Sequence, residues 1–290
     1  MSHPIRPRRS VLYMPGANAR ALDKARTLPA DALILDLEDS VAPETKALAR
    51  EQAVAAVRQG GYGHRELVVR VNALATPWGR DDIAAAAASG ADAVLAPKIE
   101  ARDDVLAVVA ALREAGAPPD LPVWAMAETP LAFLRLGEIA GAHPLLRVIV
   151  VGTSDLVKDL HARHSRERTE TLTARSLAVL AARACGLGVL DGVHLDLDDD
   201  AGLRFACEQG RGMGFDGKTL IHPRQIAAAN AAFGPSAGEL DAARRIVAAW
   251  QQARAAGQGV AVVDGRLVEA LHVQDALRLV AIADAIASRA

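Results

Sequence analysis

The sequence predicts a (β/α)8 barrel with a C-terminal helical extension. Eight short apolar segments alternate with alanine-rich stretches of helical spacing, and this alternation is typical of parallel sheets. The chain has 290 residues, and a single α/β barrel commonly uses about 200 to 250. Eight units favour a closed barrel over an open doubly wound sheet. We therefore predict a catalytic barrel over residues 1–233 and a helix–hairpin–helix extension over 234–290, which forms a lid or an oligomer contact.

The predicted elements follow the apolar runs and the turn signals between them. Strands are expected at 10–14, 32–38, 66–72, 93–99, 122–128, 148–152, 188–193 and 218–222. Helices are expected at 17–27, 43–59, 80–89, 101–115, 130–140, 172–184 and 199–213. In the extension we expect helices at 224–233 and 238–256, a hairpin over 260–268 with an Asp264-Gly265 turn, and a last helix at 273–288.

The longest interval between predicted strands contains a charged run over 161–170. Long connections of this kind are surface loops or loops that act at a site. We expect a mobile loop here, which is either a solvated surface segment or a segment that contacts a ligand.

Composition excludes several classes of protein. Hydrophobic residues make up 51% and charged residues 23%, which is typical of a folded globular chain. A net charge of −2 and 3% aromatic residues disfavour nucleic acid as a partner. Cys185 and Cys207 lack the spacing of a zinc site or a disulfide framework, so a reduced, cytoplasmic setting is expected. The basic N-terminal segment runs into too few apolar residues for a signal peptide or a membrane span.

Charged residues stand where several predicted strands end, which is the active-site end of such a barrel. Glu128 closes the fifth strand in the stretch AMAETP, and Asp155 follows the sixth. Two carboxylates on adjacent strands suit Mg2+ or Mn2+ better than zinc, because these ions prefer oxygen ligands. Arg70, at the end of the third strand, is suited to hold a carboxylate or an enolate. The alternative is an ion-pair network in which Glu128 pairs with Arg70 or Lys98.

Six segments in order along the chain together resemble the citrate lyase β-subunit-like family, which includes malyl-CoA and citramalyl-CoA lyases within the HpcH/HpaI aldolase superfamily. The segments are RSVLYMPG at 9–16, LILDLEDSV at 33–41, VRVN at 69–72, AET at 127–129, GTSDL at 152–156 and GKTLIHP at 217–223. The resemblance implies a barrel that assembles as a homotrimer or hexamer, uses Mg2+, and cleaves or forms 3-hydroxyacyl thioesters.

The resemblance also implies roles for individual residues. Glu128 and Asp155 are the implied metal ligands, and Arg70 the implied contact of the 2-oxo acid and the enolate. The remaining implied residues are acidic groups around the metal-bound waters, namely Asp36, Glu38 and Asp39, and contacts of the CoA thioester, namely Tyr13, Arg20, Lys24 and Pro223.

The segment GRLVEALH at 265–272 resembles a family segment whose aspartate reaches a neighbouring subunit as acid/base. Glu269 stands at that position here, with one methylene more, and Leu271 replaces a proline. We expect Glu269 to act as the acid/base group.

The expected activity is Mg2+-dependent cleavage or condensation of a malyl- or citramalyl-type 3-hydroxyacyl-CoA, with acetyl-CoA and a 2-oxo acid as the products of cleavage. One alternative is a citrate lyase β subunit that acts on a citryl group carried by an acyl-carrier protein. The other is a non-catalytic homologue that binds CoA or metal. The reason for this alternative is Glu269, which stands where the family has an aspartate. No nucleic acid or membrane partner is expected.

Overall fold

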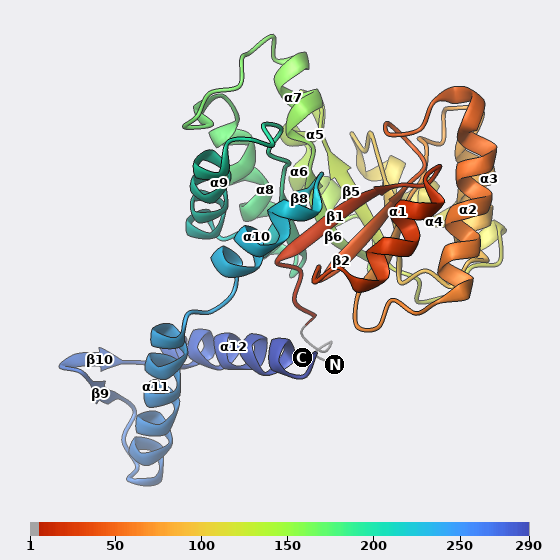
Figure 1. The fold of residues 1–290 in the computed structure, drawn as a ribbon. Helices are drawn as coiled ribbons and strands as arrows, with labels where there is room; N and C mark the ends of the chain where they lie inside the picture. Colours follow the sequence, from red (N-terminus) through yellow and green to blue (C-terminus); the bar gives the residue numbers. More distant parts are fainter. Residues whose placement is uncertain (1–5, 290) are drawn as a thin grey trace. The chain divides into compact units, whose positions relative to one another are not determined.

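The computed structural model describes residues 6–289 and contains a closed barrel of eight parallel strands (Figure 1). Each strand pairs with the next in sequence, and β1 pairs with β8 to close the barrel. This confirms the predicted fold class. The strands are β1 (Ser10–Pro15), β2 (Ala32–Asp36), β3 (Glu66–Arg70), β4 (Ala93–Ala96), β5 (Val123–Ala127), β6 (Leu146–Val151), β7 (Gly188–Asp191) and β8 (Gly217–Leu220).

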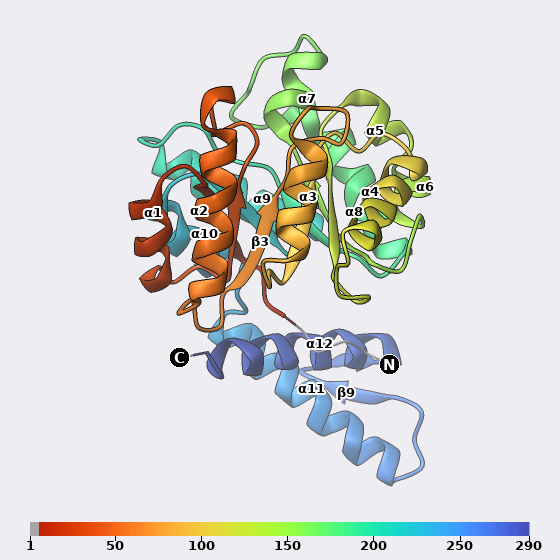
Figure 2. The same ribbon diagram turned by 90° about the vertical axis from the view of Figure 1, so that its right-hand side faces the viewer.

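Helices follow the strands and cover the outside of the barrel. Figure 2 shows α2 and α3 side by side on this outer face, where their side chains make contact. The helices of this part are α1 (Ala19–Lys24), α2 (Lys46–Gln59), α3 (Gly79–Ala87), α4 (Arg102–Glu114), α5 (Pro130–Leu134), α6 (Leu136–Ala140), α7 (Thr153–Asp159), α8 (Leu172–Ala184), α9 (Asp200–Met213) and α10 (Ile226–Phe233), with short 3-10 turns η1 (Ala25–Thr27), η2 (Pro43–Thr45), η3 (Thr169–Thr171) and η4 (Pro223–Gln225).

Alternation along the strands fills the barrel interior with apolar side chains and leaves polar ones at its upper end. Ile34, Val68 and Met126 belong to the buried apolar core inside the barrel. Because successive strand residues point to opposite faces, the residue two positions after each of them faces the same way. Those residues are Asp36, Arg70 and Glu128. The core therefore carries three charged side chains at the carboxyl ends of its strands.

The structure differs from the sequence prediction at several connections. The predicted helix 130–140 is two short helices, because Arg135 between them leaves the helical conformation (φ −111°, ψ 11°). The stretch after β6, for which no helix was predicted before residue 172, begins with helix α7, and turn η3 follows the loop that contains most of the charged run. Most strands also end one to three residues earlier than predicted.

Within the described residues, the contact pattern separates a second unit, residues 231–289 with residues 6 and 7, from the barrel unit of residues 8–230. It contains α11 (Ala237–Ala255), the hairpin β9 (Ala261–Val263) and β10 (Arg266–Val268), and α12 (Ala270–Ala287). Ala253, Val268 and Val273 belong to its own small apolar core. Asp264 and Gly265 have positive φ values of 51° and 75°, as a two-residue hairpin turn requires. The predicted helix–hairpin–helix order is confirmed; the predicted boundary after residue 233 stays a prediction.

None of the helices within residues 6–289 combines the length and apolar character needed to cross a membrane.

Candidate active site

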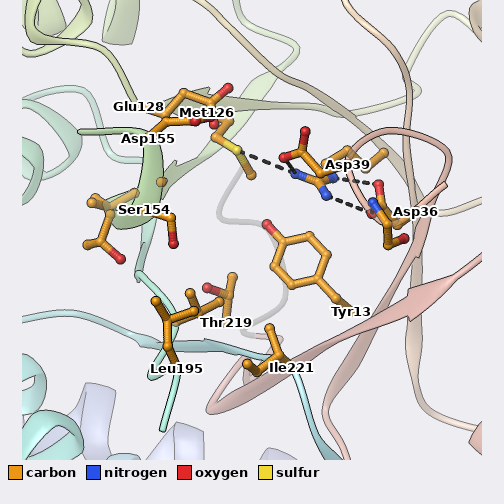
Figure 3. Close-up of a pocket in the computed structure, with 16 residues that line it drawn as sticks. Tyr13, Asp36, Asp39, Met126, Glu128, Ser154, Asp155, Leu195, Thr219 and Ile221 are labelled. Carbon is orange, nitrogen blue, oxygen red and sulfur yellow. Dashed lines mark hydrogen bonds and ion pairs between the residues drawn. The ribbon is translucent and has the colours of Figure 1, made fainter. Parts of the chain in front are cut away.

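A cavity of about 330 Å3 opens at the carboxyl ends of the barrel strands (Figure 3). Charged residues from β2, β3, β5 and the start of α7 line one part of it, and apolar residues from the ends of β6, β7 and β8 line the rest. The charged and aromatic lining residues are Tyr13, Asp36, Asp39, Arg70, Glu128 and Asp155. Six of the eleven residues predicted to form the site thus lie around one cavity.

Arg70 is held rigidly on one side of the cavity. Its Nε and Nη2 donate to Asp36 Oδ1 and Oδ2, both at 2.6 Å, in a bidentate ion pair that is almost entirely buried. Although burial opposes ionisation of Asp36, the charge of Arg70 holds the pKa of this carboxyl below its usual range. Asp36 therefore fixes two edges of the guanidinium, and Arg70 Nη1 lies 4.0 Å from the sulfur of Met126, which also lines the cavity (Figure 3).

Glu38 contacts the remaining edge of Arg70. Glu38 Oε2 lies 2.8 Å from Arg70 Nη1, yet among the described residues it finds no partner in hydrogen-bonding geometry. Burial raises the pKa of Glu38 to about 8 against the opposing charge of Arg70. At neutral pH this carboxyl therefore carries its proton and is a potential donor. Asp39 lies farther out, with its Oδ2 3.4 Å from Arg70 Nη1.

Tyr13 stacks against the arginine. The Arg70 guanidinium carbon lies 4.8 Å from the centroid of the Tyr13 ring, a cation–π distance. Burial raises the pKa of Tyr13 far above its usual value. The hydroxyl, which points into the cavity in Figure 3, therefore stays protonated. The structure thus places Tyr13 inside the cavity.

Glu128 and Asp155 meet on the opposite side of the cavity from the Arg70–Asp36 pair. The Lys98 ammonium contacts a carboxylate oxygen of each, and the Lys98 backbone N–H donates to Glu128 Oε1 at 2.8 Å. Burial raises the pKa of Glu128 to about 7 despite the nearby ammonium of Lys98. Asp155 is less buried, and its hydrogen bond from Lys98 Nζ lowers its pKa although burial opposes this.

The close approach of β5 and β6 brings these carboxyl groups together. A Cβ atom on Gly152 would lie only 2.5 Å from Glu128 Cβ, so any larger residue there would push Glu128 away. Thr129 accepts a hydrogen bond from the Ala132 N–H and caps α5, which turns the chain away directly after Glu128. The sequence AETP therefore ends a strand, presents a carboxylate and starts a helix.

The donor set fits Mg2+. This ion is usually held by one or two carboxylates with several waters, and Glu128 and Asp155 supply two carboxylates at a solvent-accessible cavity. No group of three or more His, Cys, Asp or Glu side chains suited to a metal occurs within the part of the chain that the structure describes. Structural zinc is typically held by a full set of protein ligands. Two carboxylates with open coordination positions suit a catalytic divalent ion better.

Two buried lysines, which sequence reasoning missed, support the strand ends. Lys46 Nζ donates to the carbonyls of Leu37 and Glu38 at 2.8 and 2.7 Å and to Asn72 Oδ1 at 2.8 Å, and thereby anchors the acidic loop after β2. Lys218 Nζ lies 3.1 Å from Asp191 Oδ2 and also donates to the Gly192 carbonyl. Lys46 follows Glu44 and Thr45, and Lys218 lies between Gly217 and Thr219, so no apolar run in the sequence indicated their burial.

Several predicted residues lie away from the cavity lining. Arg20 and Lys24 are exposed on α1, one turn apart, and Pro223 opens η4 after the lining residue Ile221. Glu269 belongs to the second unit, where it is exposed at the N-cap of α12 and its backbone N–H donates to His272 Nδ1 at 3.0 Å. The roles of these four residues stay predictions.

A parallel barrel whose strand ends present carboxylates and a clamped arginine has the layout of a barrel enzyme. The model of the HpcH/HpaI aldolase/citrate lyase family matches residues 9–223, and the chain belongs to this family.

Relatives and solved structures agree with the family membership. The chain is 50% identical to a protein of Cereibacter sphaeroides named (3S)-malyl-CoA thioesterase, over 99% of both chains. It is 39% identical to the citrate lyase subunit beta of Escherichia coli, over 95% of this chain and 92% of the other. A crystal structure of CitE from Mycobacterium tuberculosis, in complex with magnesium, acetoacetate and coenzyme A, superposes with a TM-score of 0.75 at 31% identity, covering 94% and 97% of the two chains.

Proposed function

We propose that this protein is a Mg2+-dependent carbon–carbon lyase that acts on a malyl- or citramalyl-type 3-hydroxyacyl-CoA. The observation that carries the proposal is the pair Glu128 and Asp155 in the same cavity as Arg70. The magnesium and coenzyme A in the related CitE structure support this assignment. Cleavage breaks the bond between the hydroxyl-bearing carbon and the carbon next to the thioester, and yields a 2-oxo acid and acetyl-CoA.

In this proposal Glu128 and Asp155 hold the ion, with Mn2+ as a possible replacement for Mg2+. When bound, the ion acts as a Lewis acid that polarises a substrate oxygen. Arg70 lines the same cavity, and its guanidinium stabilises the enolate that the departing acetyl group becomes. Asp36 keeps the guanidinium in place through its bidentate contact.

Two protons move in this reaction: the substrate hydroxyl loses one and the acetyl carbon gains one. Glu269 is the proposed acid/base group, contributed by another copy of the chain in a homotrimer or hexamer. Tyr13, whose hydroxyl stays protonated, is a donor in the cavity lining and orients a substrate oxygen. Glu38 contacts Arg70 Nη1 at 2.8 Å and helps to position the arginine. Exposed cations on α1, Arg20 and Lys24, would contact phosphates of the CoA.

Hydrolysis of the thioester is the second candidate function. The relative named (3S)-malyl-CoA thioesterase, 50% identical over nearly the full length, supports it. Hydrolysis adds water across the carbon–sulfur bond and leaves malate and free CoA, so the two reactions differ in every product. The 39% identity to a citrate lyase subunit beta likewise supports the alternative of a carrier-protein substrate.

A product analysis separates these candidates. The purified protein is incubated with Mg2+ and (3S)-malyl-CoA, and the products are identified by mass spectrometry. We expect acetyl-CoA and glyoxylate in equal amounts, and neither product with Glu128→Ala. Free CoA with malate would favour hydrolysis. Turnover of a carrier-protein thioester alone would favour the citrate lyase subunit, and binding of CoA without any turnover would favour a non-catalytic homologue.

A further inference from the structure

Lys98 has an unusual backbone conformation beside the two carboxylates. It follows β4 and has a φ of +54°, in the left-handed region that a residue with a side chain rarely adopts. Such a conformation is unfavourable by itself and persists where the surroundings hold it. Here it directs two groups of one residue toward Glu128: the backbone N–H, at 2.8 Å from Oε1, and the ammonium, at 3.4 Å from the same atom.

The ammonium of Lys98 also forms an ion pair with Asp155 Oδ2. One positive charge therefore lies against both carboxyl groups that the proposed function assigns to the metal. A lysine side chain is an ammonium at neutral pH, and the contacts with both carboxylates favour this charged form.

We propose that Lys98 is a built-in counter-ion, whose ammonium neutralises Glu128 and Asp155 in the metal-free protein and moves out when a divalent cation binds between them. The inference rests on the proposed metal site. Mg2+ needs lone pairs from both carboxylates, and an ammonium in contact with both competes for those lone pairs and repels the ion. The Lys98 ammonium and Mg2+ therefore exclude each other from the two carboxylates.

The rest of Lys98 is built to allow this exchange. Its side chain is 38% exposed and has a flexible four-carbon stem, so it can leave toward solvent. The backbone N–H stays on Glu128 Oε1 and keeps that carboxylate oriented, as an outer partner of a metal ligand does. One residue thus supplies a permanent orienting contact and a replaceable charge.

Competition between the Lys98 ammonium and Mg2+ predicts that a mutation next to the metal site increases the affinity for the metal. Lys98→Met keeps the length of the side chain and the backbone N–H but removes the charge. We expect it to bind Mg2+ about three- to fivefold more tightly than wild type, the upper part of the range expected for loss of one partly exposed competing ion pair. Isothermal titration calorimetry at pH 8.5, far above the usual pKa of a carboxyl group, measures the affinity.

Two further variants distinguish the specific contact of Lys98 with the carboxylates from a general effect of positive charge on Mg2+ affinity. Lys98→Arg retains a cation and should leave the Mg2+ affinity within about twofold of wild type. Lys158→Met removes one positive charge from α7, on a side chain that is 78% exposed, and should also change little. Equal tightening by Lys158→Met and Lys98→Met, or no tightening by Lys98→Met, would overturn the inference.

The wild-type protein gives an independent readout without any mutation. Acetic anhydride modifies free lysine amines, and mass spectrometry reports the modified fraction at each lysine. Modification of Lys98 should rise severalfold when Mg2+ is added, while that of Lys158 stays constant. Unchanged or reduced modification of Lys98 contradicts the exchange. If wild type binds no Mg2+ at all in the calorimeter, the metal site and the proposed function fail; if it binds and Lys98 does not respond, only this inference fails.

Discussion

Two lysine–carboxylate clusters lie at the ends of strands in this barrel, and they differ in exposure. Lys218 and Asp191, at β8 and β7, are both fully buried, and Arg168 Nη2 adds a second cation at 2.6 Å from Asp191 Oδ1. The side chains of Lys98 and Asp155, by contrast, are 38% and 27% exposed. The first cluster has its polar atoms committed to one another, and the second faces a cavity.

This difference separates charges that hold the fold from charges that are available for function. A buried ion pair is costly to break because the remaining charge has no water to replace its partner. An ion pair at a cavity loses little when solvent or a ligand cation takes the place of one member. The cluster of Lys218 is therefore expected to be structural, and the cluster of Lys98 exchangeable.

Removing the buried lysine should have the largest effect on stability. Lys218→Met leaves one oxygen of Asp191 without its cation and the Gly192 carbonyl without its donor. We expect a loss of about 3 to 5 kcal/mol in the free energy of unfolding, as for other broken buried pairs. Urea denaturation followed by circular dichroism measures it, with Lys158→Met as the control, for which the change should stay below about 0.5 kcal/mol. Similar midpoints for both variants would remove the distinction between the clusters.

Replacing the buried carboxylate of the second cluster should affect metal binding and leave the fold intact. Glu128→Gln keeps the shape of the side chain. Its neutral amide replaces a carboxyl group whose pKa burial already raises to about 7, so the fold should tolerate the change. We expect at least about hundredfold weaker Mg2+ binding, the upper end of the loss seen for outer-shell changes, because a direct ligand is lost. Calorimetry measures the affinity and thermal melting checks the fold. Retained affinity would place the metal elsewhere.

Acid should weaken the buried cluster through Asp191. Although burial opposes ionisation, Lys218 and Arg168 lower the pKa of Asp191 to about 2, below its unfolded value of about 3.9. The unfolded state thus binds the proton first as pH falls, so this carboxylate stabilises the fold fully above pH 4 and not at all below about pH 2. About 1 kcal/mol of its contribution is lost by pH 3.

Unfolding measured at pH 6 and pH 3 tests this loss. Asp191→Asn should show a smaller drop in stability between the two pH values than wild type. The half-exposed Asp155 serves as comparison, and Asp155→Asn should keep most of the wild-type pH dependence. An unchanged pH dependence in Asp191→Asn would show that the pair with Lys218 does not lower this pKa.

The smallest effect is expected from Lys98→Met on the metal-free protein. The free energy of unfolding should fall by less than about 1 kcal/mol, because the ion pair is partly exposed and Glu128 retains the backbone donor. Chemical denaturation in the presence of a chelator measures this value. A loss as large as that of Lys218→Met would mean that the two clusters are alike.

The barrel itself was predictable from the sequence, because its strands are short apolar runs whose alternation with helices is visible residue by residue. Period-two alternation likewise carries Asp36, Arg70 and Glu128 to the mouth once Ile34, Val68 and Met126 are recognised as core. Local patterns of this kind were enough to predict that these charged residues lie at the same end of the barrel.

Among these contacts, the ion pair between Glu128 and Lys98 was one of the expected alternatives, and the structure contains it. The other contacts depend on packing between distant segments. Nothing local in the sequence indicates that Lys98 has a positive φ or that its ammonium reaches Asp155, 57 residues away. Nor does the charged run after β6 reveal that Arg168 turns inward to Asp191.

The most direct test of the central claim is a crystal structure of the protein grown with Mg2+ and glyoxylate. We predict an ion bound to carboxylate oxygens of both Glu128 and Asp155 at about 2.1 Å, with waters or glyoxylate completing six ligands, and the Lys98 ammonium withdrawn from both. An ion bound elsewhere, or a Lys98 ammonium still seated between the two carboxylates at saturating Mg2+, would contradict the account.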